Sequence, residues 1–410
     1  MDSPTTNTSF PWNKSEAGPR IILFVGKGGV GKTTSAAATA LASAKHGYRT
    51  IVLSTDPAHS LSDSFDMKLG KEPTPLSANL WGQETDVYYN LNMYWGVVQE
   101  WIKALISWRG VEELVADEIA LLPGMEELAN LLWINQHHKS GDFDVIIIDC
   151  APTAETLQLL SFPDVANWWV ERIMPVHRRL MGIVRPIVGR FSDVPLPTGE
   201  VYDAGEDLIR RLATLRSLLA NPELASVRLV MNPEKMVIKE AHRTFTYLNL
   251  YGYAVDAIIC NRLLPEEIHA GSYLSGWKQA QLQHHQTVVE SFSPLPVFDV
   301  PLFEQEVVGL EMLDRAGQAI YGGGDPTTIF FRGHAQEFIE DDGRYRLTIA
   351  MPFASKEEIN LVRNGDELIV SVGNQRRNIT LPRSLLKLVV KSARFQDERL
   401  VITFAPDESA

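Results

Sequence analysis

The sequence is short of three things: cysteine, basic charge and long apolar runs. Only two cysteines occur in 410 residues, Cys150 and Cys260, and each lies in or beside an apolar run that predicts a buried strand. This argues against a disulfide framework and indicates a reducing compartment with two buried free thiols. The formal net charge of -13 disfavours nucleic acid as a partner, because such binding depends on clustered Lys and Arg.

The lack of long apolar runs bears on membranes. No run approaches the roughly 18 residues that a membrane-spanning helix needs, so we expect no stable membrane insertion. Residues 1–20 are polar and lack the apolar core of a secretory signal, which predicts a disordered tail. The chain as a whole, 45% hydrophobic and 22% charged, has the composition of a folded protein, and its length favours two domains.

Residues 21–320 alternate between short apolar runs and segments of helical period. This predicts an α/β domain with a doubly wound, mostly parallel sheet covered by helices on both faces. The expected strands are 21–25, 50–54, 87–92, 145–149, 227–231, 257–260 and 296–300. Two connections are too long for one crossover helix, so helical insertions are expected at about 93–140 and 160–222. In the second insertion the residues at helical spacing are Leu208, Leu212, Leu215 and Leu219.

Residues 321–410 have a different pattern of apolar and turn residues. A Gly-rich run at 321–328 predicts an interdomain linker. Short alternating strands separated by turn residues then predict a small all-β domain at 329–410. The expected strands are 345–350, 367–372, 377–381 and 400–404.

A phosphate-binding loop lies near the start of the α/β domain. Its residues are Gly26, Lys27, Gly28, Gly29, Val30, Gly31, Lys32, Thr33 and Thr34. The loop follows a predicted strand and precedes an Ala-rich helical segment, which is the order that a P-loop requires. Lys32 is expected to reach the β- and γ-phosphates of ATP, and the Thr33 hydroxyl to ligate Mg²⁺ directly. The sequence therefore predicts ATP and Mg²⁺ as cofactors.

The second lysine of this loop, Lys27, resembles the signature of the deviant Walker A P-loop ATPases. In that class the corresponding lysine contacts the nucleotide of a partner subunit. The resemblance therefore implies a homodimer with composite sites and a catalytic role for Lys27. Residues 54–63, Ser-Thr-Asp-Pro-Ala-His-Ser-Leu-Ser-Asp, and 149–153, Asp-Cys-Ala-Pro-Thr, resemble the switch segments of a narrower family. This family unites ArsA-type arsenite-pump ATPases with tail-anchored-protein targeting ATPases, and the resemblance covers about 21–319.

The family resemblance implies roles for individual residues. Asp56 looks like the catalytic residue that orients the attacking water, and Asp149 like the Walker B acid that holds Mg²⁺ through water. Both follow predicted parallel strands, at the edge where ligands bind. Later positions look like nucleotide contacts: Glu234, Asn261, Pro301 and Leu302. The alternative for the acidic and amide side chains is a structural one, in which they cap turns.

The chain departs from its relatives in several respects. It lacks the Cys-x-x-Cys pair that joins the cytosolic targeting ATPases through zinc, so we expect no zinc. Two cysteines at strand ends cannot form a thiol site for a metalloid, which disfavours activation by metalloids. Ala154 and Glu155 stand where the family usually has Gly-His. Residues 329–410 resemble the α-crystallin fold, an appendage of bacterial and plastid members, so we expect a cytoplasmic or equivalent soluble plastid location.

An apolar stripe at helical spacing runs through 169–187, interrupted by Pro175 and Pro186. Such a stripe is either core or, as the resemblance implies, a groove for client transmembrane helices, which Met and Trp suit. The candidates are Trp169, Ile173, Met174, Leu180 and Met181. We therefore expect a homodimeric ATPase whose hydrophobic helical chamber serves as a chaperone or targeting factor for membrane-protein segments. The alternatives are the ATPase subunit of a metalloid or anion transporter, and a spatial regulator like the partition ATPases.

Overall fold

The structure is a computed structural model of the chain. It describes residues 18–55, 60–84, 87–108, 130–150, 195–268, 273–333, 336–341, 344–365, 367–381, 385 and 388–406, with only the backbone of 87–95.

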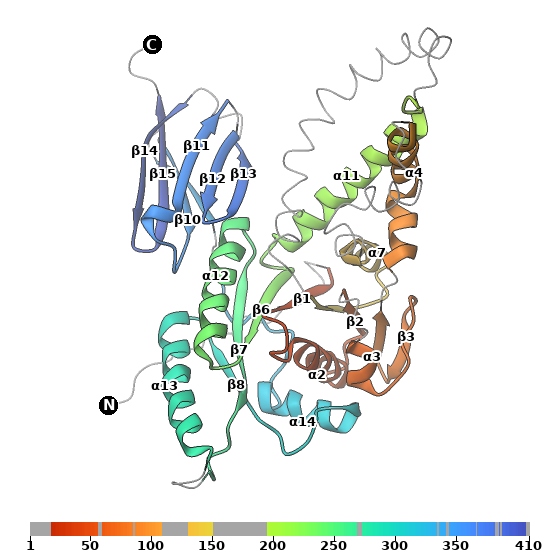
Figure 1. Cartoon of the computed structure of the whole chain (residues 1–410), viewed down its shortest axis with the longest axis vertical. Helices are drawn as coiled ribbons and strands as arrows, with labels where there is room; N and C mark the ends of the chain where they lie inside the picture. Colours follow the sequence, from red (N-terminus) through yellow and green to blue (C-terminus); the bar gives the residue numbers. More distant parts are fainter. Residues whose placement is uncertain are drawn as a thin grey trace.

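A central sheet of eight strands organises the first domain (Figure 1). Its order is β3-β4-β2-β5-β1-β6-β7-β8, and all neighbours are parallel except β3 and β4. The strands are β1 (Arg20–Val25), β2 (Thr50–Ser54), β3 (Thr74–Ser77), β4 (Leu80–Glu84), β5 (Val145–Asp149), β6 (Ala225–Met231), β7 (Val255–Leu263) and β8 (Val297–Pro301). Strands β1, β2, β5 and β6 are buried along their whole length, which explains their continuous apolar runs. The predicted α/β fold is confirmed.

Helices connect these strands. They are α2 (Lys32–Lys45), α3 (Ser60–Phe65), α4 (Val87–Trp108), α7 (Trp133–Ser140), α11 (Gly199–Leu219), α12 (Lys235–Tyr251), α13 (Ser275–Phe292) and α14 (Gly309–Tyr321). The leucine spacing predicted for α11 is confirmed, because Leu208, Leu212, Leu215 and Leu219 are all buried. Helices α4 and α11 lie side by side and extend away from the sheet (Figure 1). Among the described residues, no helix is both long enough and apolar enough to cross a bilayer.

One expected strand is wrong. Residues 87–92 begin helix α4 instead of forming a strand. A short apolar run does not distinguish a strand from a helix, and this one continues as an apolar segment to Trp108. The strand at this point in the sheet is β4, and the β3–β4 pair before α4 was not predicted.

A buried charged cluster lies toward the amino-terminal ends of the central strands. Arg20, placed by the sequence at the end of the tail, instead begins β1 and has no exposed surface. Its Nη2 lies 3.2 Å from Asp256 Oδ2, and Arg228 Nε lies 3.5 Å from Asp256 Oδ1. Arg228 also donates to the Tyr321 hydroxyl at 2.7 Å. Burial is the main cause that lowers the pKa of Arg20, to about 10, so the guanidinium stays charged at neutral pH.

The same cluster holds the expected linker, 321–328. Arg20 Nε donates to the Thr327 carbonyl at 3.0 Å, and Arg228 Nη2 donates to the Pro326 carbonyl at 2.7 Å. The Thr327 side chain is fully buried. The run between the domains is therefore packed onto the first domain, a feature that its Gly-rich composition did not indicate.

The second domain consists of two antiparallel sheets, as predicted. One has the order β14-β15-β10-β9 and the other β11-β12-β13. Their bounds are β9 (Gln336–Asp341), β10 (Arg344–Ala350), β11 (Ile359–Asn364), β12 (Glu367–Val372), β13 (Gln375–Thr380), β14 (Leu388–Gln396) and β15 (Arg399–Pro406), with a 3-10 turn at Lys356–Glu358. Strands β9, β11 and β14 were not predicted. Their polar residues weaken the apolar alternation that marks a strand.

This domain packs on helix α12 (Figure 1). Leu250 of α12 belongs to the hydrophobic core of the β domain. Tyr251 donates its hydroxyl to Gln375 Oε1 at 2.8 Å, and the His242 ring stacks on Phe353 with 3.8 Å between centroids. The β domain therefore packs on helix α12 of the first domain.

Candidate nucleotide-binding site

The P-loop has the predicted context, since strand β1 ends at Val25 and helix α2 begins at Lys32. Gly31 caps this helix in a left-handed conformation, with φ 94°. A Cβ atom there would lie 2.2 Å from Asn261 Nδ2, and one at Gly26 would lie 2.1 Å from the Val230 carbonyl oxygen. Both glycines are therefore required by close approach of neighbouring chain segments as well as by loop geometry.

Lys32 and Thr33 follow the last glycine of the loop, and each makes one polar contact near it. Lys32 is only 9% exposed, and its Nζ donates to the Lys27 carbonyl at 3.3 Å. The Thr33 hydroxyl lies 3.3 Å from the Ser60 hydroxyl at the start of α3. The Lys32 ammonium group thus lies against the backbone of the loop, and the Thr33 hydroxyl lies at the start of α2. In a P-loop, groups in these positions contact phosphate and Mg²⁺, respectively.

Strands β2 and β5 end beside this loop. Asp149 is the last residue of β5 and is 1% exposed. The amide of Thr55, after β2, donates to the Asp149 carbonyl at 3.1 Å. Asp56 itself lies outside the described residues, but Thr55 and Ser60 on either side of its segment contact Asp149 and Thr33.

A cleft of about 600 Å³ opens where the loop ends and α2 begins. It brings together five residues that the sequence assigns to nucleotide binding: Gly31, Thr34, Asn261, Pro301 and Leu302. The Asn261 amide donates to the Val30 carbonyl at 2.8 Å and accepts from the Arg262 amide at 2.8 Å. Asn261 thus joins strand β7 to the P-loop at the rim of the cleft.

The cleft also has features that were not predicted, among them Phe303 in its lining and Arg315 packed against the Phe303 ring. Phe303 adds an aromatic wall, and the Arg315 guanidinium lies 5.5 Å from the centre of its ring. Phe303 directly follows Pro301 and Leu302, and this adjacency is the signal that could have indicated it. Arg315 comes from α14, so no local pattern links it to the site.

Glu234 lies apart from the Asn261 cleft. It precedes α12 as an exposed cap residue and lines a second cleft of about 570 Å³ with Met236, Tyr273 and Trp277. The structure therefore brings Asn261, Pro301 and Leu302 together in one cleft, but not Glu234.

Lys27 is half-exposed at the rim of the P-loop. Its Nζ lies 3.2 Å from Glu240 Oε2 on α12, with side-chain exposures of 40% and 47%. Glu240 was not predicted because it follows Lys27 by more than 200 residues and belongs to no motif. The client candidates Trp169, Ile173, Met174, Leu180 and Met181 all lie outside the described residues.

Comparison with known proteins identifies the family of the chain. The anion-transporting ATPase family, ArsA_ATPase, matches residues 19–322, and an HSP20-like domain found in ArsA matches 342–404. A protein of Aquifex aeolicus that carries the name arsenical pump-driving ATPase is 43% identical, covering 93% of this chain and 99% of its own length. ATPase GET3 of Phaeosphaeria nodorum is 28% identical and covers 72% and 93%, respectively.

The family resemblance expected from the P-loop and the switch segments is thereby confirmed, and so is the α-crystallin-like domain. Hydrolysis of ATP is the activity common to this family. The chain belongs to the ArsA family of ATPases and carries a C-terminal HSP20-like domain.

Proposed function

We propose that the chain works as a homodimer in which ATP binding and hydrolysis open and close a hydrophobic helical chamber for membrane-protein segments. The phosphates of ATP occupy the P-loop 26–34, with Lys32 at the β- and γ-phosphates. The base enters the cleft bounded by Asn261, Pro301 and Leu302. This assignment is supported by the continuity of that cleft with Gly31 and Thr34 at the start of α2.

The residues near the loop also suit Mg²⁺. Hydroxyl and carboxylate oxygens are the hard ligands that this ion prefers. Thr33 supplies a hydroxyl at the start of α2, and Asp149 supplies a carboxylate at the end of β5. Thr33 would bind the ion directly and Asp149 through water. The ion supplies charge neutralisation at the phosphates, while Asp56 orients the attacking water at the γ-phosphate.

The exposed position of Lys27 carries the dimer proposal. A half-exposed lysine at the rim of the P-loop, which within the described part of the chain pairs with the surface residue Glu240, can reach across to the nucleotide of a second copy. The surface beside Glu234 is apolar and exposed: Met236, Tyr273 and Trp277 are 69%, 89% and 63% exposed. A second copy would cover such a surface, as apolar patches of this kind mark interfaces.

The chamber proposal is supported by the helices that extend beyond the sheet. On α4, Val97 and Trp108 are 48% and 45% exposed. In contrast, Leu131 and Trp133 of the same insertion are 1% exposed, so they belong to the core. The sequence stripe at 169–187 supplies further apolar residues, and wide, Met-rich surfaces accept varied apolar helices.

A double variant tests whether the stripe binds clients. Ile173→Asp with Leu180→Asp should leave the thermal unfolding temperature and ATP turnover near wild type while crosslinking to an apolar peptide is lost. The matched control is Leu212→Asp with Leu215→Asp, two leucines of α11 that are 2% and 0% exposed and should not tolerate buried charge. The client proposal fails if the stripe variant unfolds like the control while crosslinking per folded molecule is unchanged.

A second candidate function follows from the names of the relatives. Those of Aquifex aeolicus and Chlorobaculum tepidum are called arsenical pump-driving ATPases. Against this role, the chain has only Cys150, directly after β5, and Cys260, in β7. Strands β1 and β6 lie between them, and a soft metalloid needs neighbouring thiols. Stimulation of ATP turnover by arsenite or antimonite would favour the pump role over the client role.

A further inference from the structure

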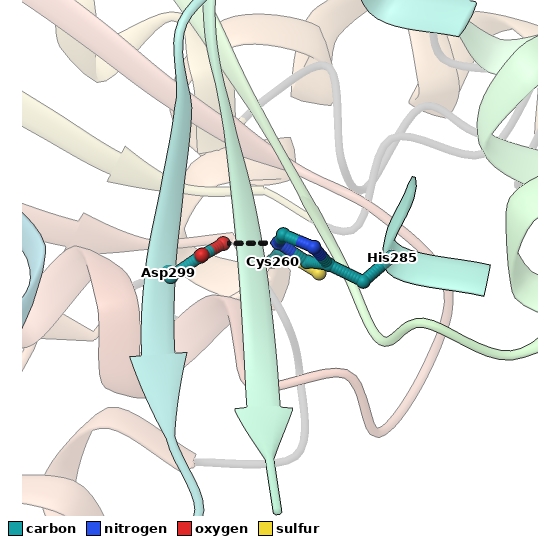
Figure 2. Close-up of side chains that lie close together, drawn as sticks. All are labelled: Cys260, His285 and Asp299. Carbon is teal, nitrogen blue, oxygen red and sulfur yellow. Dashed lines mark hydrogen bonds and ion pairs between the residues drawn. The ribbon is translucent and has the colours of Figure 1, made fainter. Parts of the chain in front are cut away.

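Three side chains from two strands and one helix form a separate cluster (Figure 2). They are Cys260 on β7, Asp299 on β8 and His285 on α13. Cys260 and Asp299 are register partners on adjacent parallel strands, and α13 carries His285 against them. One ligand atom from each residue lies within 4.8 Å of the others, and His285 Nε2 lies 2.7 Å from Asp299 Oδ1.

We propose that Cys260, His285 and Asp299 bind one thiophilic divalent cation of the zinc class. Thiolate, imidazole and carboxylate are the ligands that zinc uses in proteins. Bonds of about 2.0–2.3 Å in a tetrahedral site hold ligand atoms roughly 3.5 Å apart, so this cluster needs only small side-chain rotations. Three protein ligands leave a fourth position for water or an exogenous group.

The surroundings give the cation a route to the site. A cleft of about 520 Å³ includes His285 and Asp299 in its lining, together with the charged residues Glu266, Glu267 and Lys278. The exposed fraction of the side chains decreases from the cleft inward. Asp299 is 50% exposed, His285 is 25% exposed and Cys260 is fully buried. The carboxylates of this lining outnumber its one lysine, and the resulting negative potential favours cation entry.

A Cys, His and Asp arrangement also occurs in enzymes with a nucleophilic thiol. Here Cys260 is fully buried, so a substrate has no access to its sulfur. A cation that reaches the cluster displaces the thiol proton, because the thiolate is the form that binds metal.

The cluster adjoins the proposed base cleft, since Pro301 lines both this cleft and the one that contains His285 and Asp299. Asn261 follows Cys260 in the chain, and Pro301 comes two residues after Asp299. A cation joining β7, β8 and α13 would hold the strand ends that carry both residues. We therefore expect the cation to preorganise the nucleotide site and to raise its affinity for ADP. This expectation rests on the proposed function of that site.

The first test is a titration of the full-length, metal-free protein. Zn²⁺ competed against a chromophoric chelator should give one tight site per chain, weakened at least about 10-fold by Cys260→Ala, His285→Gln or Asp299→Asn. The matched controls are Cys150→Ala and His284→Gln, which retain the cluster. With Co²⁺ as the probe, a thiolate charge-transfer band should appear in the wild type and in Cys150→Ala, and be absent from Cys260→Ala.

Thermal unfolding without metal shows that each variant is folded, and His285→Gln, on the surface, serves if Cys260→Ala is not. Equal Zn²⁺ affinity in the wild type and the cluster variants, or a Co²⁺ spectrum without the thiolate band, overturns the site. Zn²⁺ should lower the Kd for ADP in the wild type and not in Cys260→Ala. If ADP affinity does not change, the coupling is wrong while the site stands. If ADP does not bind at all, the proposed nucleotide site fails independently.

Discussion

Charged side chains at the two ends of the central sheet differ in burial and in their contacts. Toward the amino-terminal ends, Arg20, Arg228 and Asp256 are fully buried and contact one another. At the carboxyl ends, Lys27 is half-exposed and Glu234 is exposed, beside clefts of several hundred Å³. Charges at one end hold the strands and the interdomain run together, whereas charges at the other end are available to a ligand.

The contrast follows from the geometry of parallel sheets. Ligands bind at the carboxyl ends of the strands, where the loops diverge. A charge buried at the opposite end must be paired within the protein, because desolvation of an isolated ion is too costly. Substitutions at the carboxyl ends should therefore change turnover and leave stability near wild type, and those at the amino ends should do the reverse.

The largest expected effect comes from the P-loop itself. Lys32→Ala should lower ATP turnover by at least about 10³-fold, because it removes a positioned charge at the developing phosphate charge. Asp56→Asn should also abolish turnover but leave ATP binding intact, since only the water loses its orientation. Equilibrium binding of ATP beside single-turnover hydrolysis separates the two variants, and hydrolysis near the wild-type rate in Asp56→Asn would remove Asp56 from the mechanism.

At the amino-terminal ends of the central strands, the substitution that tests the contrast is Asp256→Asn. It leaves the buried guanidinium groups of Arg20 and Arg228 without their carboxylate, which should cost about 3–5 kcal/mol of stability. The control is Glu206→Gln, which breaks an exposed pair with Arg210 on α11 and should cost less than about 1 kcal/mol. Chemical denaturation measures both, and a turnover defect per folded molecule in Asp256→Asn would break the contrast.

A pH effect on stability is expected near the amino ends of β2 and β5. His137 is 4% exposed, its Nε2 lies 2.8 Å from Gln83 Oε1, and burial lowers its pKa to about 4. The unfolded chain, with a histidine pKa of about 6.5, takes up the proton first as pH falls, so stability declines below about pH 6.5.

At pH 5 this group alone should cost about 2 kcal/mol relative to pH 7.5. The measurement is the free energy of unfolding at both pH values for the wild type and His137→Gln. The decline should be smaller in the variant by this amount, and equal declines would contradict the assignment.

The smallest effect is expected at the Lys27–Glu240 pair. If Lys27 must leave Glu240 to reach the nucleotide of a partner, Glu240→Gln should raise turnover. An exposed pair contributes at most about 1 kcal/mol, which limits the increase to about 5-fold. The measurement is the steady-state turnover of Glu240→Gln, with Glu206→Gln as the control for an exposed pair away from the site. A decrease in turnover would indicate that Glu240 assists Lys27 instead.

The sequence predicted the carboxyl end of the sheet better than the amino end. The P-loop was predictable because its chemistry depends on adjacent residues: a strand, spaced glycines and a helix start. The pairing of Arg20 with Asp256 was not predictable, since it joins residues 236 positions apart that belong to no motif. The Cys260, His285 and Asp299 cluster was missed for the same reason, as it combines three elements.

Within the fold, the errors also have physical causes. The buried parallel strands were found because their apolar runs are continuous. Residues 87–92 were misread because a short apolar run is also compatible with the first turns of an apolar helix. The packing of 321–328 was missed because it depends on side chains of β1 and β6, distant in the sequence.

Mixing two inactive variants tests the central proposal, a composite site completed by Lys27 of a second copy. Equal amounts of Lys27→Ala and Asp56→Asn chains form mixed dimers in which one site has both groups. If subunits exchange freely, half of the dimers are mixed and half of their sites are complete, so about a quarter of wild-type turnover should return. No return of activity, although mixed dimers are demonstrated by differential tags, would contradict the proposal.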